Sequence, residues 1–320
     1  MKRLLTILCV IIFFIAMLLF PQTTFQGAST GVLLWFHTIL PTLLPFLIIS
    51  NLLIQTGAID IISRLLAPVL CRFFRVSPYG AFVILVGFLC GCPMGSKVAA
   101  DLLKKELISK NEACYLLSFC NNTSPMFIVS YILWQNLKVR KLTLPLLTLL
   151  TAAPIMLSFG FRRLYHIPRQ GGRVCQTCHT AHNRKSSLQV PGLGEDAGSL
   201  DYCIMNGFET ITRIGGYIIL FSILISFAGL FTEPPIAFTA FLLPSLEITT
   251  GITMICSAPF SLNLKLLQAL ALTSFGGWCA AVQTRAMIQG TSLPFLPYIA
   301  EKLITALATS LLLWIFLAFY

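Results

Sequence analysis

Charged residues are scarce in this chain of 320 residues. They make up only 10% of it, whereas soluble domains carry about 25%. Hydrophobic residues account for 57%, and the mean hydropathy is +0.86. So little charge excludes a soluble protein and indicates a multi-pass integral membrane protein with the lipid bilayer as its surroundings. The net charge of +11 is attributed to membrane orientation and contact with anionic lipid, not to binding of nucleic acid.

Sequence signatures of membrane-embedded enzymes are also missing. The chain has no H-E-x-x-H motif, no G-x-S-x-G motif and no paired histidines in its apolar segments, where His37 is the only histidine. The stretch Gly95-Ser96-Lys97 places hydroxyl and lysine in the reverse order of the phosphate-loop consensus G-x-x-x-x-G-K-[ST]. We therefore expect a protein that is not an enzyme, with no catalytic residues, no metal site and no cofactor.

Long apolar runs predict an all-α polytopic membrane protein with about eight membrane helices. Lys2 and Arg3 precede the first run, and no A-x-A-like cleavage site follows it, so we interpret it as a retained signal anchor, with a cleaved signal peptide as the alternative. At about 20 apolar residues per span, the candidates are Leu4–Phe20, Val32–Thr56, the short Tyr79–Pro93, Ala113–Trp134, Leu142–Phe161, Cys203–Phe231, Pro235–Cys256, Leu264–Ile288 and Pro297–Phe319.

Basic residues predict the orientation and the organisation. Because cytoplasmic loops are enriched in lysine and arginine, Lys2 and Arg3 place the N-terminus inside. The polar stretch 162–202 contains six basic residues between Arg162 and Lys185 and is also assigned inside. We expect four regions: a signal anchor and external loop (1–30), a first transmembrane half (31–161), this basic loop (162–202) and a second transmembrane half (203–320). The basic run 138–141 contradicts a simple count, so either segment 113–134 does not fully cross or its loop is an exception.

The basic loop contains Cys175-Gln-Thr-Cys178-His179, followed by His182. C-x-x-C-H is a haem-attachment pattern, and with His182 it equals a four-ligand zinc set. Haem attachment occurs outside the cytoplasm, where the arginines do not place this loop. We favour a loop without a ligand, with zinc and haem as alternatives.

A cluster of helix-breaking residues follows the apolar run 82–88. Gly91-Cys-Pro93-Met-Gly95-Ser96-Lys97 cannot continue a helix easily, and an amphipathic helix begins directly behind it. This pattern predicts a helical hairpin that enters the membrane and breaks near its tip, because irregular backbone survives at that depth only inside protein or beside a watery cavity. Free N–H groups at Gly95 and Ser96, together with the charge of Lys97, would then form an anion site. An ordinary cytoplasmic turn with a snorkelling lysine is the alternative.

A second interruption, Asn121-Asn122-Thr123-Ser124-Pro125, lies inside an otherwise apolar helix. Such polar residues are costly in a span unless they face a cavity or a partner. Neutral donors and acceptors at these positions suit a polar planar ligand. Hydrogen bonding between helices is the other interpretation.

The second half contains two comparable interruptions. Pro244-Ser-Leu-Glu247-Ile-Thr249-Thr-Gly251 places an acid in one apolar segment, and Thr273-Ser274-Phe-Gly276-Gly277 breaks the next. A glycine-rich and a polar interruption therefore occur in each half, in opposite order. Paired interrupted segments in two halves indicate a transporter site at the interface of two repeats, and an inverted repeat is one arrangement of such halves.

Several of these stretches resemble one known family. The segment GFLCGCPMGSKVAADLLKKELISKNEACYLLSFCNNTSPMFI and the second-half segments LLPSLEITTGI and ALTSFGGWCAAVQT resemble the YlbJ-type sporulation integral membrane proteins of endospore formers. These proteins belong to the nucleoside-recognition, or Gate, superfamily. Members of this superfamily look like relatives of concentrative nucleoside transporters. The resemblance runs from about residue 31 to 304 and implies re-entrant hairpins and interrupted helices.

The resemblance implies transport of dipicolinic acid from the mother cell toward the forespore, across the outer forespore membrane. Alternatives are a carrier of a nucleoside-like solute, a scaffold of a sporulation complex without transport, and a membrane enzyme or haem protein. We expect a secondary transporter whose partner is a small solute; a homo-oligomer stays open. The predicted substrate-binding residues are Gly91, Pro93, Gly95, Ser96, Lys97, Asn121, Asn122, Thr123, Ser124, Glu247, Thr249, Ser274, Gly276 and Gly277.

Overall fold

The computed structural model describes residues 2–56, 58–167, 200–230 and 241–319. All regular structure in these ranges is helical, which confirms the predicted all-α class. The helices are α1 Lys2–Leu19, α2 Pro21–Leu34, η1 Trp35–Ile39, α3 Leu40–Gln55, α4 Ile59–Phe74, α5 Pro78–Leu89, α6 Met94–Lys104, α7 Lys110–Cys120, α8 Pro125–Phe127, η2 Ile128–Asn136, η3 Arg140–Leu142, α9 Thr143–Leu164, α11 Leu200–Ala228, α12 Leu243–Leu246, α13 Ile248–Ser257, α14 Leu262–Phe275, α15 Gly277–Met287 and α16 Phe295–Phe319.

Six helical segments are long and apolar enough to cross a membrane, against about eight predicted. They are Pro21–Leu53, Lys110–Asn136, Arg140–Leu164, Leu200–Ala228, Leu262–Met287 and Phe295–Phe319. A seventh would be the pair Ala67–Phe74 and Pro78–Leu89, which is bent by 91°. The lower number has two reasons: α1 is a short apolar helix, and the described part of segment 235–256 consists of short helices that separate at Glu247.

Segment 113–134, whose topology was left open because of the basic run 138–141, lies within one of these six segments. Residues 110–136 have the length and the composition of a complete span despite their central break. The basic loop, in contrast, is mostly outside the described residues, and with it the Cys175, Cys178 and His179 pattern.

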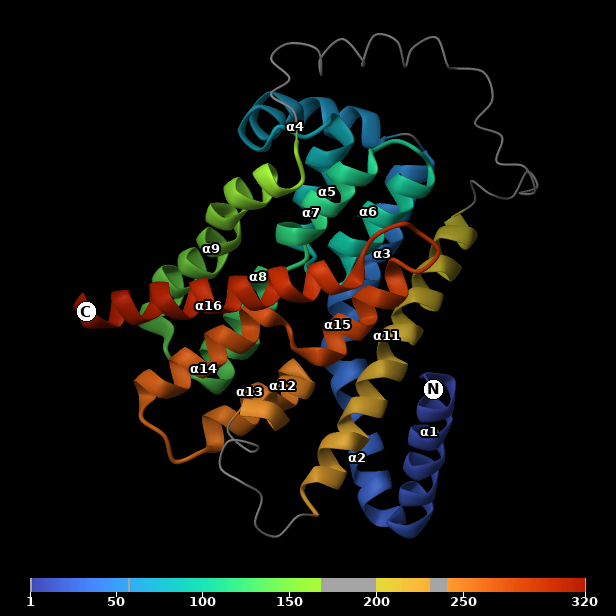
Figure 1. The fold of residues 1–320 in the computed structure, drawn as a ribbon, viewed down its shortest axis with the longest axis vertical. Helices are drawn as coiled ribbons and strands as arrows, with labels where there is room; N and C mark the ends of the chain where they lie inside the picture. The colour runs from blue at the N-terminus through green and yellow to red at the C-terminus, as the bar shows by residue number, and fades with distance from the viewer. Residues whose placement is uncertain (1, 57, 168–199, 231–240, 320) are drawn as a thin grey trace.

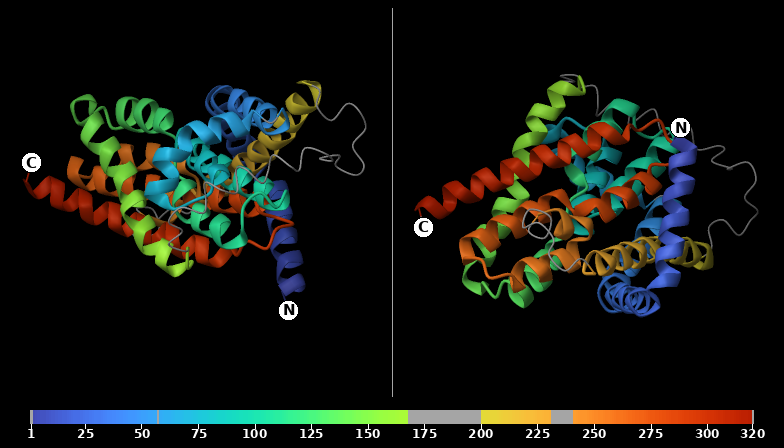
Figure 2. Two further views of the ribbon diagram at one scale, coloured as in Figure 1. Left: turned by 90° about the horizontal axis from the view of Figure 1, so that it is seen from above. Right: turned by 60° about the horizontal axis from the view of Figure 1, so that its bottom comes forward.

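The same order of elements recurs in the two halves. In the first, a hairpin of α5 and α6 precedes the broken span α7–η2 and the long helix α9; in the second, a hairpin of α12 and α13 precedes the broken span α14–α15 and the long helix α16. Figure 1 shows α4–α7 at one end of the molecule and α12–α14 toward the other, so the hairpins approach the centre from different sides. Figure 2 shows the same elements from above and from below.

Small residues hold the first span against α11. A Cβ atom added to Gly27 or Gly31 would lie 2.8 Å from the Cα atom of a residue in α11, so only glycine permits this approach. Further along, the indole Nε1 of Trp35 donates a hydrogen bond of 2.9 Å to the Ile211 carbonyl. Trp35 begins a π-helical segment just before Pro41, which lacks an N–H donor. The long helix therefore stays packed on α11 through α2, η1 and α3.

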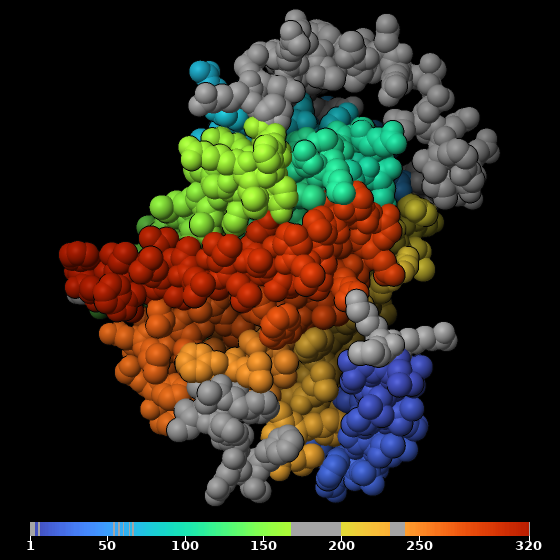
Figure 3. Space-filling model, viewed as in Figure 1, coloured from blue at the N-terminus to red at the C-terminus, as the bar shows by residue number. Residues whose placement is uncertain are grey.

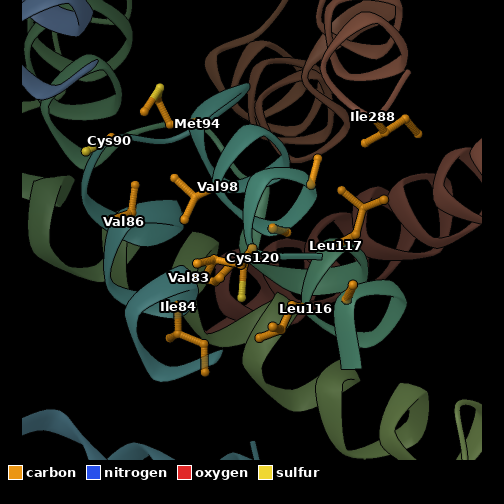
Figure 4. Close-up of a cluster of buried hydrophobic side chains, with 14 of the residues drawn as sticks. Val83, Ile84, Val86, Cys90, Met94, Val98, Leu116, Leu117, Cys120 and Ile288 are labelled. Atoms are coloured by element: carbon orange, nitrogen blue, oxygen red, sulfur yellow. The ribbon is translucent and has the colours of Figure 1, made fainter. Parts of the chain in front are cut away.

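The largest apolar core surrounds the first hairpin and α7. Figure 4 shows Val83 and Val86 of α5, Val98 of α6 and Leu117 of α7 in one cluster, with Ile288 reaching it from the end of α15. α16 runs across one face, between α9 on one side and α13 and α14 on the other (Figure 3). The broken backbone segments at the centre are therefore enclosed by packed helices rather than exposed to lipid, as irregular backbone at membrane depth requires.

Candidate functional site

The tip of the first hairpin packs against the break in the next span. The Cys92 amide donates a hydrogen bond of 2.6 Å to the Asn122 carbonyl. Gly91 has a φ of +81°, and a Cβ atom there would lie 2.6 Å from the backbone nitrogen of Ser124. Only glycine adopts this conformation and leaves room for this contact. We call this contact between the hairpin tip (residues 90–93) and the break in the span (residues 121–124) the first junction. Its glycine is on the hairpin, and its polar residues are on the span.

The second half has the same junction with the roles exchanged. Here the polar residue, Glu247, is at the hairpin tip between α12 and α13, and the glycines are in the broken span α14–α15. Gly277 has a φ of +83°, and a Cβ atom there would lie 3.1 Å from the Ser245 carbonyl oxygen. Each junction thus needs one glycine-bearing partner, which accounts for the opposite order of the interruptions in the sequence.

Hydrogen bonds connect the first junction to the second half. The Thr123 hydroxyl donates a bond of 2.8 Å to the Thr273 carbonyl, at the end of α14. The Asn121 side-chain amide donates two bonds of 2.8 Å, to the Thr284 hydroxyl of α15 and to the Tyr298 hydroxyl of α16. Asn121 is buried, so these bonds satisfy groups that have no access to water. The two halves therefore meet through polar groups at their breaks.

A cavity of about 80 Å³ lies at this meeting point. Residues from all four interruptions line it, together with residues of α3 and α11. Its polar lining consists of Thr42, Thr123, Ser124, Glu247, Thr249 and Gln283, together with the thiols of Cys90, Cys92 and Cys279. Asn122 and Ser274 are among the residues that line a smaller cavity of about 20 Å³. Among the predicted site residues, Thr123, Ser124, Glu247, Thr249 and Gly276 thus come together around one cavity, and Asn122 and Ser274 lie around the smaller one.

Glu247 is buried, with 3% of its surface exposed. Its Oε1 accepts a hydrogen bond of 2.9 Å from the Thr249 amide and its Oε2 one of 2.8 Å from the Thr250 amide. These amides begin α13, where the helix dipole is positive. Both carboxylate oxygens are therefore occupied, and the helix end offsets the negative charge.

Replacing Glu247 with alanine should weaken the second hairpin. The variant loses both N-cap bonds, and we expect a loss of about 1–2 kcal/mol in the free energy of unfolding. Thermal unfolding of the purified protein measures the effect. Ser261→Ala is the matched control, because Ser261 caps α14 through one long bond of 3.4 Å at an exposed position. An equal loss in both variants would contradict this role of Glu247.

The start of α6 has no amide group directed at the cavity. Gly95 N–H donates to the Gly91 carbonyl, and Ser96 N–H donates to Asn121 Oδ1 at 3.3 Å. The Lys97 ammonium donates to Asp101 Oδ2 at 3.1 Å and to Asn206 Oδ1 of α11 at 3.2 Å. Pro93, Gly95, Ser96 and Lys97 are thus absent from the cavity lining, and a carboxylate compensates the charge of Lys97.

A lysine that sequence reasoning missed lies at the first junction. Lys302 of α16 is 3% exposed, and its Nζ donates bonds of 3.1 Å to the Asn121 carbonyl and to Asn122 Oδ1. Among the described residues, the two ion pairs found are Lys97–Asp101 and Arg213–Glu209, so Lys302 has no carboxylate partner there. The available signal was the charged pair Glu301-Lys302 inside an otherwise apolar helix.

The neighbouring acid is directed elsewhere. Adjacent residues of a helix point about 100° apart, and Glu301 accepts a hydrogen bond from the Tyr165 hydroxyl just beyond α9. Burial, followed by the contact with Glu301, raises the pKa of the Tyr165 hydroxyl above its usual range. Tyr165 therefore remains a donor, and the Glu301 carboxylate is held away from Lys302.

Two comparisons with known proteins agree with this architecture. Residues 36–134, from η1 through the first hairpin to the broken span, match the family described as Gate, nucleoside recognition. The chain is 29% identical to the sporulation integral membrane protein YlbJ of Bacillus subtilis (strain 168) over 325 aligned positions, which cover 92% of this chain and 78% of that protein. No solved structure matches.

These similarities support a membrane transporter or a sporulation membrane protein. The match to YlbJ agrees with the residues that resemble the YlbJ-type proteins. Over 92% of its length the chain is thus similar to the sporulation integral membrane protein YlbJ, and residues 36–134 in its first half are similar to the Gate nucleoside-recognition family.

Proposed function

We propose that this protein is a secondary transporter of a small anionic solute, with dipicolinic acid as the preferred solute. In a sporulating cell it would move dipicolinate from the mother cell toward the forespore across the outer forespore membrane. The proposal rests on the YlbJ-type resemblance and on one structural observation. That observation is the buried ammonium of Lys302, which has no carboxylate partner among the described residues. Lys302 does not line either cavity itself, but it donates to Asn122, which lines the smaller one.

An uncompensated cation at this depth is the feature that favours an anion. Ionisable groups in membrane segments are costly and mark substrate or ion pathways. Dipicolinate is planar and carries two carboxylates beside a pyridine nitrogen, so it needs positive potential and neutral hydrogen-bond donors. Lys302 supplies the potential, and the hydroxyls of Thr123, Ser124 and Thr249 are the donors around the cavity.

The other predicted site residues shape this arrangement in our proposal. Gly91 and Gly277 permit the close tip-to-break contacts, and Asn121 holds the first junction to α15 and α16. Lys97 adds positive charge at the hairpin, reduced by its contact with Asp101. We therefore assign the larger electrostatic role to Lys302.

The arrangement of spans is suited to alternating access. With the bent pair Ala67–Phe74 and Pro78–Leu89 taken as a re-entrant segment, three of the six long apolar segments precede the basic loop and three follow it. An odd number of crossings in each half reverses the orientation of the second half relative to the first, as in transporters built from inverted repeats. The two hairpins then enter from opposite sides of the membrane and alternately close the cavity.

A nucleoside-like solute is the second candidate, favoured by the Gate match over residues 36–134. Its polar groups would also suit the threonine and serine hydroxyls around the cavity. A neutral nucleoside, however, gains nothing from the charge of Lys302. A scaffold without transport would need neither the cavity nor the four interruptions, so we rank it below both carriers.

Deletion of the gene in the sporulating organism tests the proposal. We expect dipicolinate to accumulate in the mother cell and to be strongly depleted in the spore, with both restored by the wild-type gene. The measurement is dipicolinate in the separated compartments. Normal spore dipicolinate in the deletion strain would refute this solute.

A further inference from the structure

The break between α7 and α8 leaves backbone carbonyl groups without helical partners. The last carbonyls of a helix are unsatisfied and form the negative end of its dipole. In α7 this end lies at Cys120 and Asn121, inside the protein. The Lys302 ammonium donates to the Asn121 carbonyl and to the Asn122 side-chain oxygen, both at 3.1 Å. One ammonium therefore satisfies two oxygens that the break leaves open.

This is the type of place where transporters bind a coupling ion. Unwound backbone carbonyls and the C-terminal ends of half-helices coordinate sodium in carriers with discontinuous helices. A coordinated metal cation is surrounded by neutral oxygens as well as carboxylates. Lys302 has such an environment: two neutral oxygens, the Asn121 carbonyl and Asn122 Oδ1, accept its hydrogen bonds. The acids Glu247 and Glu301 accept hydrogen bonds from other donors.

We propose that the Lys302 ammonium is a built-in cation that takes the place of a coupling ion at the first junction. The protein therefore operates without sodium at this position. Replacing Lys302 with a shorter side chain should leave the position of its ammonium open as a site for a small monovalent cation. The part about coupling rests on the proposed transport function, but the cation site itself can be measured without any solute.

Thermal unfolding of the purified full-length protein in detergent is the test. Wild type, Lys302→Ala and Lys302→Met are compared in sodium, potassium, ethylammonium and the bulky N-methylglucamine cation, all as chlorides at equal ionic strength. We expect the wild-type midpoint to be the same in all four within about 1 °C. For Lys302→Ala we expect a midpoint about 5 °C lower in N-methylglucamine, and recovery of at least half of this loss in one of the small cations.

Two controls define the site. Lys302→Met fills the space without a charge, so its midpoint should not depend on the cation. Lys265→Ala removes another ammonium that donates to a backbone carbonyl, that of Cys256 at 2.7 Å. Lys265 is only partly buried, so water replaces its ammonium and small cations should restore nothing.

The outcomes separate this inference from the proposed function. Stabilisation of the wild type by sodium relative to N-methylglucamine would overturn it, as would a folded Lys302→Ala variant that behaves identically in all cations. If Lys302→Ala does not fold in any cation, small cations do not replace the ammonium, and the inference also fails. Failure of dipicolinate transport with the expected cation responses would instead refute the proposed solute alone.

Discussion

Lys302→Met will reduce dipicolinate transport at least about tenfold while the protein still accumulates in the membrane. The substitution removes two charge-assisted hydrogen bonds at the broken span, and such bonds contribute about 1.5–3 kcal/mol each. Methionine has nearly the length of lysine and removes a buried charge, which favours folding. Uptake into membrane vesicles, normalised to the amount of protein, measures the effect.

Lys265→Met is the matched control for this prediction. Its ammonium also donates to a backbone carbonyl, but at the end of α13 rather than at the Asn121 break, and its side chain is only partly buried. We expect its uptake to remain close to that of the wild type. Lys97→Ala should fall between the two, because Asp101 compensates the charge of Lys97. Wild-type uptake by Lys302→Met would contradict the role given to this lysine.

Gly91→Ala should also strongly reduce transport, for a reason of backbone geometry. The residue has a φ of +81°, and the added Cβ atom would approach the Ser124 nitrogen to 2.6 Å. A left-handed conformation alone costs an alanine about 1–2 kcal/mol, and the close contact must displace the hairpin tip from the broken span. We expect an unfolding midpoint several degrees lower and uptake reduced at least about tenfold.

The same substitution elsewhere should have the opposite effect on stability. Gly216 is inside α11, and a Cβ atom there meets nothing within 4 Å. Alanine in a helix interior is more stable than glycine by about 0.5–1 kcal/mol. Gly216→Ala should therefore unfold at an equal or higher temperature and transport normally. If Gly91→Ala behaved in the same way, the tip-to-break contact would have no role in function.

Hydrophobic runs and helix-breaking residues predicted much of this fold. The all-helical class, the interruption after Gly91 and the one at Asn121–Ser124 follow from length, proline and glycine, because these set local backbone geometry. The described residues contain six or seven candidate spans, so the predicted number of about eight is approximate. An apolar run does not reveal whether it crosses or returns. Segment 235–256 is such a run: its described part is short and turns at Glu247.

The site was harder to predict because it depends on contacts between distant segments. Lys97 follows the glycine motif directly, but the turn of α6 carries it toward Asn206 of α11. Lys302 follows the Asn121 break by 181 residues, and in the sequence it is one of two adjacent charges near the start of a long apolar helix. Its place beside the break follows only from the packing of α16 on α7 and α14.

The most direct measurement is dipicolinate uptake by proteoliposomes that contain the purified protein. The account predicts saturable uptake by the wild type above protein-free liposomes, uptake at background level for Lys302→Met, and no comparable uptake of a neutral nucleoside such as uridine. Absence of dipicolinate uptake by folded wild-type protein, or equal uptake by Lys302→Met, would contradict the proposed anion carrier.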